Sequence, residues 1–431
     1  MTQTEKADRR SAGFRWRSIA AAVFLPTILF STGEGALLPI IPVVATDLGA
    51  SLALAGLVAS LIMVGELIGD IPSGWIVTRI GERNAMLGGA ILALVGVVCA
   101  ALAREPWLLA AGTFLIGLAT AVFALARHAF MTTYVPIHIR ARALSLLGGV
   151  FRGGWFVGPL LATVVIRITG TGHAVYWVHA AACVAVIIAL LALPDPERAV
   201  ARADPGPTRE CADPSEPDPA DGLIAGLRRF AEVYLRVGIG SALLMALRSS
   251  RVAILPLWAL SIGMAEADST LVIGLANGLD FALFYVSGLV MDRWGRLWAA
   301  VPALLGLGVG HLALALTHEA GSRTVWFIVL AIVLGFANGL SSGVNMTLGA
   351  DLAPRDRPAP FLGGWRFITD AGNAVAPLAI SGLTFALSLP AAAAALGAAG
   401  LVGAWMLAHW VPRYVRTAER PAPSGTGRSP S

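Results

Sequence analysis

The stretch GWIVTRIGER at residues 74–83 decides the fold of this chain, because a related stretch, GLVMDRWGR, stands at residues 288–296. The two copies are offset by 214 residues in a chain of 431 residues, which is close to half its length. Each copy directly follows a long apolar segment. The repeat therefore indicates a duplicated membrane protein with two related halves.

The composition is that of an integral membrane protein. The chain is 57% hydrophobic and 13% charged, whereas soluble domains carry roughly 25% charged residues. Its apolar residues form runs that are long enough to cross a bilayer core of about 30 Å. Because lipid offers no partners for backbone polar groups, these runs must be helices. The twelve predicted spans are Ser18–Val43, Leu52–Val77, Ala85–Leu102, Trp107–Ala126, Ala143–Ile166, His173–Leu193, Val237–Ile262, Leu271–Met291, Trp298–Leu316, Val325–Leu348, Phe361–Leu387 and Ala391–Val411.

The spans divide into two six-helix halves, residues 1–193 and 237–411, joined by a linker at 194–236 and followed by a tail at 412–431. The first part of the linker is rich in proline and acidic residues, a composition typical of disorder. Its last part, Leu223–Arg236, has apolar residues at helical spacing. That part is either an interfacial amphipathic helix or an extension of the seventh span.

The arginines and lysines predict the orientation of the chain. With twelve spans both termini lie on one side, and 24 of the 31 basic residues fall in segments on that side. The positive-inside rule therefore places both termini in the cytoplasm and the protein in the inner (plasma) membrane. The basic balance reflects this topology, and we expect no nucleic-acid partner. The first run carries Glu34 and ends without a cleavage site, so we interpret it as a span rather than a signal peptide.

The motif copies resemble those of a known family. The second copy resembles the cytoplasmic loop motif G-x-x-x-D-[RK]-x-G-[RK] of the major facilitator superfamily, and the first departs from it at Thr78 and Glu82. Gly154, Gly158 and Pro159 in the fifth span resemble the antiporter motif of the family, although the glycine pair that usually ends this motif is missing. Twelve spans, a long central loop and the duplication extend the resemblance over essentially the whole chain.

Residues 35–42, GALLPIIP, resemble the first helix of the twelve-helix drug–proton antiporters. Thr113 departs from that group, because an arginine usually stands four residues before the glycine that is Gly117 here. The resemblance implies an all-α membrane fold of twelve transmembrane helices in two pseudo-symmetric six-helix bundles. It also implies proton-coupled export. No proton-relay role for a fourth-helix arginine can be carried over.

The repeated motif is expected to form a cytoplasmic gate. The resemblance implies that Asp292 latches the outward-facing state. Gly74 and Gly288 would let neighbouring helices approach closely at the inner surface, and Arg293 and Arg296 suit the negative end of a helix dipole. The alternative is plain topology, since arginines after a span are expected inside. The residues assigned to the gate are Gly74, Arg79, Gly81, Arg83, Gly288, Asp292, Arg293, Gly295 and Arg296.

In the fifth span, Gly154, Gly158 and Pro159 are predicted to bend the helix and pack it tightly against a partner. The alternative is that glycine and proline are simply common in membrane helices.

Nine ionisable residues lie within the predicted spans. A charge at the bilayer centre costs at least about 2.5–3.5 kcal/mol, so we expect these residues to face a central cavity. The carboxylates are candidates for proton coupling or for a cavity charge network, with Glu34 and Glu66 as first choices; the alternative is a fixed network that holds the helices together. The carboxylates are Glu34, Glu66, Asp70, Asp280 and Asp370, and the arginines, assigned to substrate binding or counter-charge, are Arg152, Arg248, Arg251 and Arg366.

Positions in the two halves predict which charges correspond. The motif offset matches Glu66 with Asp280, and alignment of Pro39 with Pro256 matches Glu34 with Arg251 across the midplane, where transporter sites lie. Arg251 and its neighbour Arg248 would bind an anionic substrate or neutralise Glu34 and Glu66.

Spacing along single helices predicts two further pairs. Glu66 and Asp70 are like charges four residues apart on one face, and proton binding by one would relieve their repulsion. Arg366 and Asp370 form a self-contained opposite pair at the same spacing.

Together these features predict a secondary active transporter that exports a small organic compound in exchange for protons by alternating access. The alternatives are import, or transport of an acidic metabolite through the arginines. A non-transporting membrane sensor is an alternative of another class. An enzyme is not expected, because no HExxH, nucleophile elbow or phosphate loop is present. The expected partners are the substrate, protons and the lipid bilayer. We expect a monomer without cofactor or metal.

Overall fold

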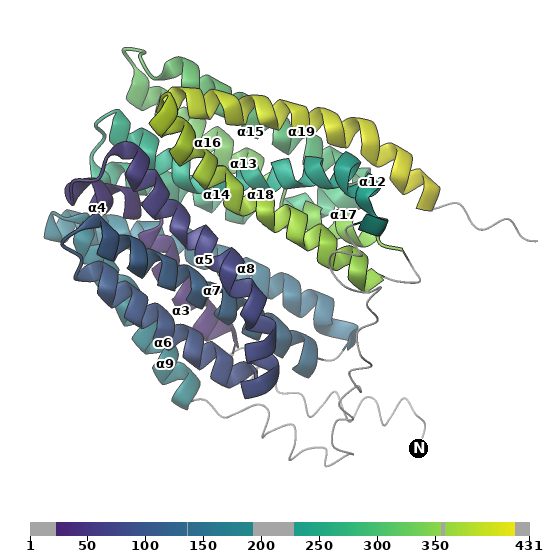
Figure 1. Ribbon diagram of the computed structural model, residues 1–431, viewed down its shortest axis with the longest axis horizontal. Helices are drawn as coiled ribbons and strands as arrows, with labels where there is room; N and C mark the ends of the chain where they lie inside the picture. The colour runs from purple at the N-terminus through teal and green to yellow at the C-terminus, as the bar shows by residue number, and fades with distance from the viewer. Residues whose placement is uncertain (1–22, 136, 193–227, 355–357, 419–431) are drawn as a thin grey trace, which may run out of the picture.

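The computed structural model describes residues 23–135, 137–192, 228–354 and 358–418, and all regular secondary structure in these ranges is helical (Figure 1). The first half contains α3 (Leu25–Leu37), α4 (Ile41–Asp47), α5 (Leu52–Ile80), α6 (Glu82–Ala101), α7 (Pro106–Tyr134), α8 (Ile137–Thr169) and α9 (Val175–Ala192). The second half contains α12 (Ala231–Val233), α13 (Ile239–Ser261), α14 (Glu266–Trp294), α15 (Leu297–Thr317), α16 (Arg323–Leu340), α17 (Val344–Leu352), α18 (Pro358–Ala386) and α19 (Leu389–Ala418).

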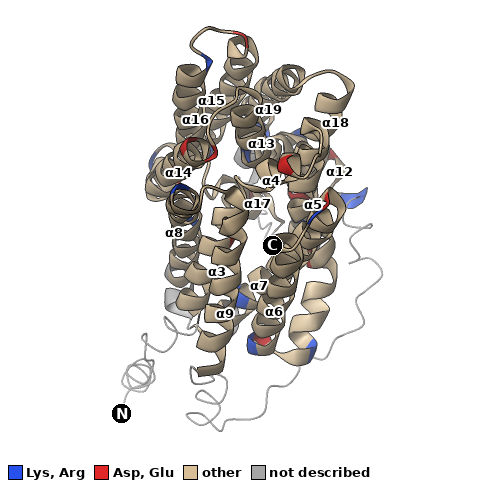
Figure 2. Cartoon of the chain, turned by 90° about the vertical axis from the view of Figure 1, so that its left-hand side faces the viewer, with Lys and Arg blue, Asp and Glu red and all other residues tan. Residues whose placement is uncertain are grey.

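The helices are those of a multi-pass membrane protein, as the sequence predicts. Within the described ranges, ten segments are long and apolar enough to cross a membrane, and the bent pair of α3 and α4 would make eleven. The remaining predicted span, the eleventh, is α18, which has 29 residues but carries charged side chains that reduce its apolar character. In Figure 2 the charged residues lie mainly near helix ends, and long stretches of helix carry none.

The duplication is visible in the helices themselves. α5 and α14 both have 29 residues, and their bounds differ by the motif offset of 214 residues. Each ends at a motif glycine with positive φ, +82° at Gly81 and +93° at Gly295. Glycine adopts this conformation without steric cost. The N–H of Gly81 donates to Val77 O at 3.0 Å, and that of Gly295 donates to Met291 O at 3.1 Å.

The two halves also pack by the same rules. In the first half α3 packs against α8 and α9, and in the second half α13 packs against α18 and α19. α5 packs against α7 as α14 packs against α16. The halves meet mainly where α8 packs against α14 and α5 against α18, so each half contributes one helix to each contact (Figure 1).

Two spans that the sequence predicts as continuous are broken. The first bends by 41° between α3 and α4, where Pro39 cannot donate a backbone hydrogen bond. The tenth is interrupted between α16 and α17, where Gly343 has a φ of +79°. Broken spans are tolerated in membrane proteins where the freed backbone is buried in protein or borders a cavity.

The segments outside the two halves are only partly described. Residues 193–227, most of the predicted linker, and the start of the first predicted span lie outside the described residues. From Ala231 onward the chain runs into α13 as one membrane-length segment. The buried Tyr234 hydroxyl there donates to Phe361 O at 2.8 Å. This part therefore extends the seventh span. At the other end, α19 continues beyond Val411 to Ala418.

Candidate functional site

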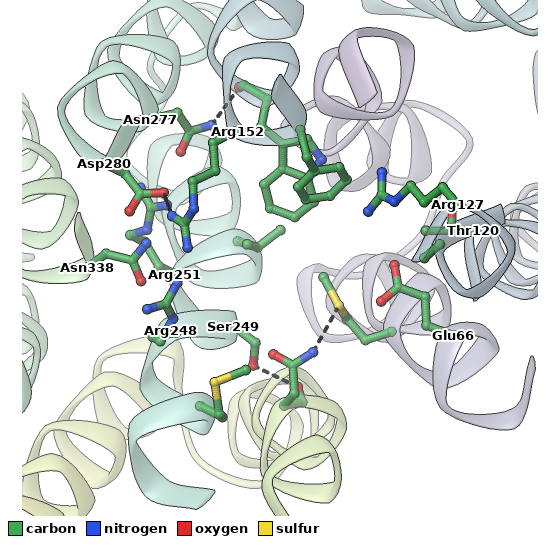
Figure 3. A pocket seen from close by; sticks show the side chains of 17 residues that line it. Glu66, Thr120, Arg127, Arg152, Arg248, Ser249, Arg251, Asn277, Asp280 and Asn338 are labelled. Carbon is green, nitrogen blue, oxygen red and sulfur yellow. Dashed lines mark hydrogen bonds and ion pairs between the residues drawn. The ribbon is translucent and has the colours of Figure 1, made fainter. Parts of the chain in front are cut away.

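A cavity of about 310 Å³ lies between the two halves (Figure 3). Its volume is near the lower end of the range for small-molecule sites, roughly 300–1,000 Å³. Both halves contribute polar and aromatic side chains to it. The lining residues are Met63, Glu66, Thr120, Ala124, Arg127, Phe151, Arg152, Trp155, Met245, Arg248, Ser249, Arg251, Val252, Asn277, Asp280, Asn338 and Asn373.

The wall formed by α5 and α7 of the first half is acidic with one arginine. Glu66 of α5 and Arg127 of α7 face the cavity (Figure 3). Glu34 of α3 is fully buried behind this wall. Its carboxylate accepts hydrogen bonds from the Thr120 hydroxyl at 2.8 Å and from the Trp155 indole N–H at 3.1 Å. Because Thr120 and Trp155 also line the cavity, they connect Glu34 to it.

Arg127 is a site residue that the sequence analysis missed. The fourth span was predicted to end at Ala126, which left Arg127 among the cytoplasmic charges. In the structure α7 continues to Tyr134 and the Arg127 side chain is buried, interacting electrostatically with Glu34 and Glu66. Its guanidinium also lies 4.6 Å from the centroid of the Phe151 ring. The sequence does contain a sign that the helix continues past Ala126, because no glycine or proline that could end it follows Arg127 before Pro136.

The opposite wall is basic. Arg152 of α8 and the two arginines of α13, Arg248 and Arg251, gather around Asp280 of α14 (Figure 3). Nη1 of Arg152 lies 2.7 Å from Oδ2 of Asp280, and this ion pair joins the first half to the second. Nη1 of Arg248 donates to the Ser341 hydroxyl at 2.7 Å. Arg251 is 4% exposed, and its Nε and Nη1 have no hydrogen-bond partner.

The predicted pairing of Glu34 with Arg251 is wrong. Glu34 bonds to Thr120 and Trp155, whereas Arg251 interacts with Asp280. The error came from aligning Pro39 with Pro256. The offset of 214 residues holds for the turn glycines Gly49 and Gly263, which both have positive φ. That register matches Pro42 with Pro256 and Glu34 with Arg248.

The α13 arginines lie near other charges than the carboxylates Glu34 and Glu66. Arg248 and Arg251 interact electrostatically with Asp280 and Arg152. The arginine that interacts with Glu34 and Glu66 is Arg127.

A smaller cavity of about 180 Å³ adjoins the first and shares Glu66 with it. Arg366 of α18 lies between two carboxylates there: Nη2 is 3.8 Å from Oδ2 of Asp70, and Nε is 3.2 Å from Oδ2 of Asp370. Arg366 and Asp370 are therefore not a self-contained pair, because Asp70 of α5 joins them across the two halves. The Arg366 side chain is 63% exposed, so this cavity is accessible from outside.

The cavities continue toward one end of the bundle and are closed at the other. We call the end that carries Gly81 and Gly295 the motif end. At the opposite end, Leu38, Ile41 and Val252 belong to an apolar contact that encloses only about 10 Å³. The Ser381 hydroxyl of α18 donates to Ala53 O of α5 there at 2.7 Å.

The motif glycines do not lie at a close helix contact, which corrects the expectation for the gate. A Cβ atom at Gly74 or Gly288 would have no neighbouring atom within 4 Å. No neighbouring helix therefore approaches α5 at Gly74 or α14 at Gly288 in this state. Asp292 is 83% exposed, and its Oδ1 lies 4.0 Å from Nη1 of Arg296.

The basic residues of the motifs bind helix ends. Arg83 donates to the carbonyls of Leu190 and Leu191 in the last turn of α9, where a cation is favoured by the helix dipole. Arg296 donates to Asp351 Oδ2 at 2.9 Å and to Met291 O at 3.1 Å.

The remaining arginines of the motifs stack on tryptophans. The guanidinium of Arg79 lies 5.2 Å from the ring centroid of Trp75, and that of Arg293 lies 5.6 Å from the ring centroid of Trp294.

The glycines of the fifth predicted span lie against α3. A Cβ atom at Gly154 would be 2.8 Å from the backbone nitrogen of Thr32. One at Gly158 would be 2.8 Å from the carbonyl carbon of Gly35. Pro159 lies inside the continuous helix α8. These small residues let α3 and α8 approach closely, and this contact brings Trp155 to Glu34.

Two halves of the same helical order around a charged cavity, closed at one end, define a membrane transporter. The chain belongs to the Major Facilitator Superfamily, whose family model matches residues 23–359 and 237–431. Members of this family are transporters and not enzymes.

Two relatives with curated sequences share about a quarter of their aligned residues with this chain. The chain is 24% identical over 332 residues to "Multidrug resistance protein MdtL" of Escherichia coli strain SMS-3-5 / SECEC, covering 76% of this chain and 79% of that protein. It is also 24% identical over 147 residues to "Inositol transporter 4" of Arabidopsis thaliana. That match covers 34% of this chain and spans only 25% of the length of the inositol transporter.

Solved structures share the fold. A POT family transporter in complex with 5-aminolevulinic acid superposes with a TM-score of 0.72 at 13% identity, covering 92% of this chain and 96% of that one. A D-xylose-proton symporter superposes with a TM-score of 0.70 at 14% identity, covering 93% of this chain and 98% of that one.

Proposed function

We propose that this protein is a proton-coupled exporter of small organic compounds in the inner membrane, with the motif end and both termini in the cytoplasm. The observation that carries the proposal is Glu66, a carboxylate that faces the central cavity together with Arg127. The similarity to a multidrug resistance protein over most of both chains supports export. The excess of basic residues on the terminal side supports the orientation.

Proton coupling follows from the competition for Arg127. With Glu66 ionised, Arg127 interacts with two carboxylates, Glu66 and Glu34. A proton on Glu66 removes one of these charges and leaves Arg127 with Glu34, so the charge of the wall depends on the proton. Thr120 and Trp155 donate hydrogen bonds to Glu34 and face the substrate, so they transmit this change in charge between the proton site and the cavity.

Alternating access follows from the unequal ends of the bundle. The arrangement described here, closed at the opposite end and accessible at the motif end, is the state that takes up substrate from the cytoplasm. Rocking of the halves about the α8–α14 and α5–α18 contacts would exchange the closed and open ends around the same cavity. Asp292 and the exposed Arg366 would then become part of the closed motif end.

The test uses purified protein in proteoliposomes with an imposed pH gradient and three radiolabelled probes: benzylpenicillin (an anion), ethidium (a cation) and chloramphenicol (neutral). We expect the gradient to drive at least one probe against its concentration gradient. Glu66→Gln should abolish this gradient-driven transport while leaving proton-independent exchange of the same probe. Glu105→Gln, which changes an exposed carboxylate outside the cavities, serves as the control. Wild-type gradient-driven transport by Glu66→Gln would contradict the proposal.

A further inference from the structure

We infer that the cavity selects small organic anions, whose acidic group binds the guanidinium groups of Arg152, Arg248 and Arg251. This inference rests on the proposed function and names its substrate class. The apolar part of such a molecule would lie against Phe151 and Trp155 on the facing wall.

The basic wall has more positive than negative charges. Arginine stays protonated in proteins, so three positive charges face one carboxylate, Asp280, whose Oδ2 is already paired with Arg152. The facing wall offsets at most one of these charges, because Arg127 stands there against two carboxylates, Glu66 and Glu34, so a positive surplus remains. A surplus of buried positive charge is costly in a membrane protein unless an anion joins it. The site is therefore complementary to an added negative charge.

The basic wall also has hydrogen-bond donors that no protein group uses. Nε and Nη1 of Arg251 are buried and have no partner in the protein, and Arg251 lines the cavity. Arg248, one helical turn away, also points into the cavity (Figure 3), and its Nη1 donates to the Ser341 hydroxyl. A guanidinium offers a planar fork of donors that matches the paired oxygens of a carboxylate or phosphonate. Two such forks on one face of α13 form a built binding site for that group.

The remaining lining residues distinguish an organic anion from an inorganic one. The rings of Phe151 and Trp155 lie with centroids 5.3 Å apart and line the cavity. The Trp155 indole N–H already donates to Glu34, so its ring presents an apolar surface. Met245 and Val252 add further apolar surface. A ligand with an acidic end and an apolar or aromatic body fits these two regions together.

A cationic ligand is a poorer fit for the same reasons. The Glu34 carboxylate accepts two hydrogen bonds from neutral donors behind the wall. Asp280 is surrounded by guanidinium groups. Of the carboxylates around this cavity, only Glu66 faces it without a hydrogen bond, and Arg127 interacts with it.

Direct binding of a matched pair of probes tests the inference. The full-length protein in detergent is titrated calorimetrically with 4-phenylbutyrate and with the neutral 4-phenylbutyramide. We expect the anion to bind at least about ten-fold more tightly than the amide, as charge-assisted hydrogen bonds to two arginines predict. Arg248→Gln and Arg251→Gln should each weaken binding of the anion by a similar factor without changing that of the amide. Arg248→Lys should have an intermediate effect, because it keeps the charge but loses the fork.

Arg323→Gln is the matched control, because it removes an exposed arginine at the start of α16. Thermal unfolding of each variant separates lost binding from lost folding, and Arg248, which is less buried than Arg251, keeps the test valid if Arg251→Gln is unstable. Equal affinity for the two probes, no binding of 4-phenylbutyrate at millimolar concentration, or unchanged affinity in both glutamine variants would overturn the inference. Arginine-dependent binding without any gradient-driven transport would instead overturn the proposed function alone. Gradient-driven transport with no preference for the anion would overturn the inference alone.

Discussion

At the scale of single residues, Arg152 has the most consequential position. It belongs to the first half, yet its guanidinium bonds to Asp280 of the second half at 2.7 Å and lies 5.1 Å from the ring centroid of Phe284. Removing one partner of a buried ion pair leaves the other charge uncompensated. The loss is more severe when Asp280 is removed, since Arg248 and Arg251 also depend on it.

Asp280→Asn should therefore lower the free energy of unfolding by about 3–5 kcal/mol. Arg152→Gln should have a smaller effect, because Asp280 keeps two other guanidinium groups nearby. The double variant should lose clearly less than the sum of the single losses. The free energy of unfolding of all three variants is measured by denaturant titration in mixed micelles. Strictly additive losses would show that the pair contributes no stability.

The bond from Thr120 to Glu34 predicts a second effect at this scale. Thr120→Val keeps the shape of the side chain but removes the hydroxyl that donates to the buried carboxylate at 2.8 Å. We expect a loss of about 1–3 kcal/mol in stability. Thr113→Val is the control on the same helix, because that hydroxyl donates only to Leu109 O of its own helix. Equal stability changes in the two variants would contradict the role given to Thr120.

At the scale of helices, the contact between α3 and α8 depends on the absence of side chains. Gly158 and Gly154 of α8 lie against the backbone of α3, and Gly35 of α3 lies against α8. A Cβ atom at Gly35 would be 2.9 Å from Cα of Trp155. The same contact positions the Trp155 indole at Glu34. Helix packing at this place therefore determines the geometry of the acidic wall.

Gly158→Ala should destabilise the protein and reduce transport, because its methyl group would meet the backbone of α3 at Gly35. Gly149→Ala on the same helix is the control, since a Cβ there would have no atom within 4 Å. That change should be neutral, or stabilising by roughly 0.5–1 kcal/mol, because alanine favours a helix over glycine. Thermal unfolding and transport rates of both variants test this difference. Similar losses in the two would argue against a close contact.

The motif copies at the ends of α5 and α14 predict unequal effects on transport. Only the second copy has an acidic residue, Asp292, where the first has Thr78. The Thr78 hydroxyl donates to carbonyls of its own helix, Gly74 O and Trp75 O. Asp292→Asn should therefore slow transport more than Thr78→Ala. The two variants are compared by their transport rates in proteoliposomes. Equal effects would contradict the assignment of a latch to Asp292.

Helices could be predicted from this sequence more fully than the contacts between them. Lipid forces long apolar runs to be helical, and the motif offset matches the bounds of α5 with those of α14, although the predicted spans Leu52–Val77 and Leu271–Met291 both end three residues early. Hydropathy does not mark where a helix continues beyond the bilayer core, so Arg127 was placed outside the cavity. The partners of Glu34 and Arg366 depend on which helices become neighbours. That information is distributed over all contact faces and appears in no single motif.

At the scale of the whole molecule, the closed end opposite the motifs determines the state of the transporter. The two halves meet there through α5 and α18, where Ser381 bonds to Ala53 O. If the halves rock during transport, this contact must open in every cycle. A covalent bond across it would hold the protein in the state described here.

Cysteines at Gly56 and Ser381 should form that bond. A Cβ atom at Gly56 would lie 3.6 Å from Cβ of Ser381, within the range of about 3.5–4.5 Å that disulfides require. In a background without the three native cysteines, oxidation of the double variant should stop transport, and a reductant should restore it. The single-cysteine variants should be insensitive to oxidant. Undiminished transport by the cross-linked protein would show that this end does not open.

The matched carboxylates Glu66 and Asp280 have a consequence for the path of the substrate. Their positions are equivalent in the two halves, but one faces a single arginine and the other faces three. The backbone of the molecule is thus nearly symmetric while the electric field across its cavity is polarised. A solute with a dipole would enter this field in one orientation and keep it while the halves move. The transporter would carry such a molecule always with the same end turned toward the second half.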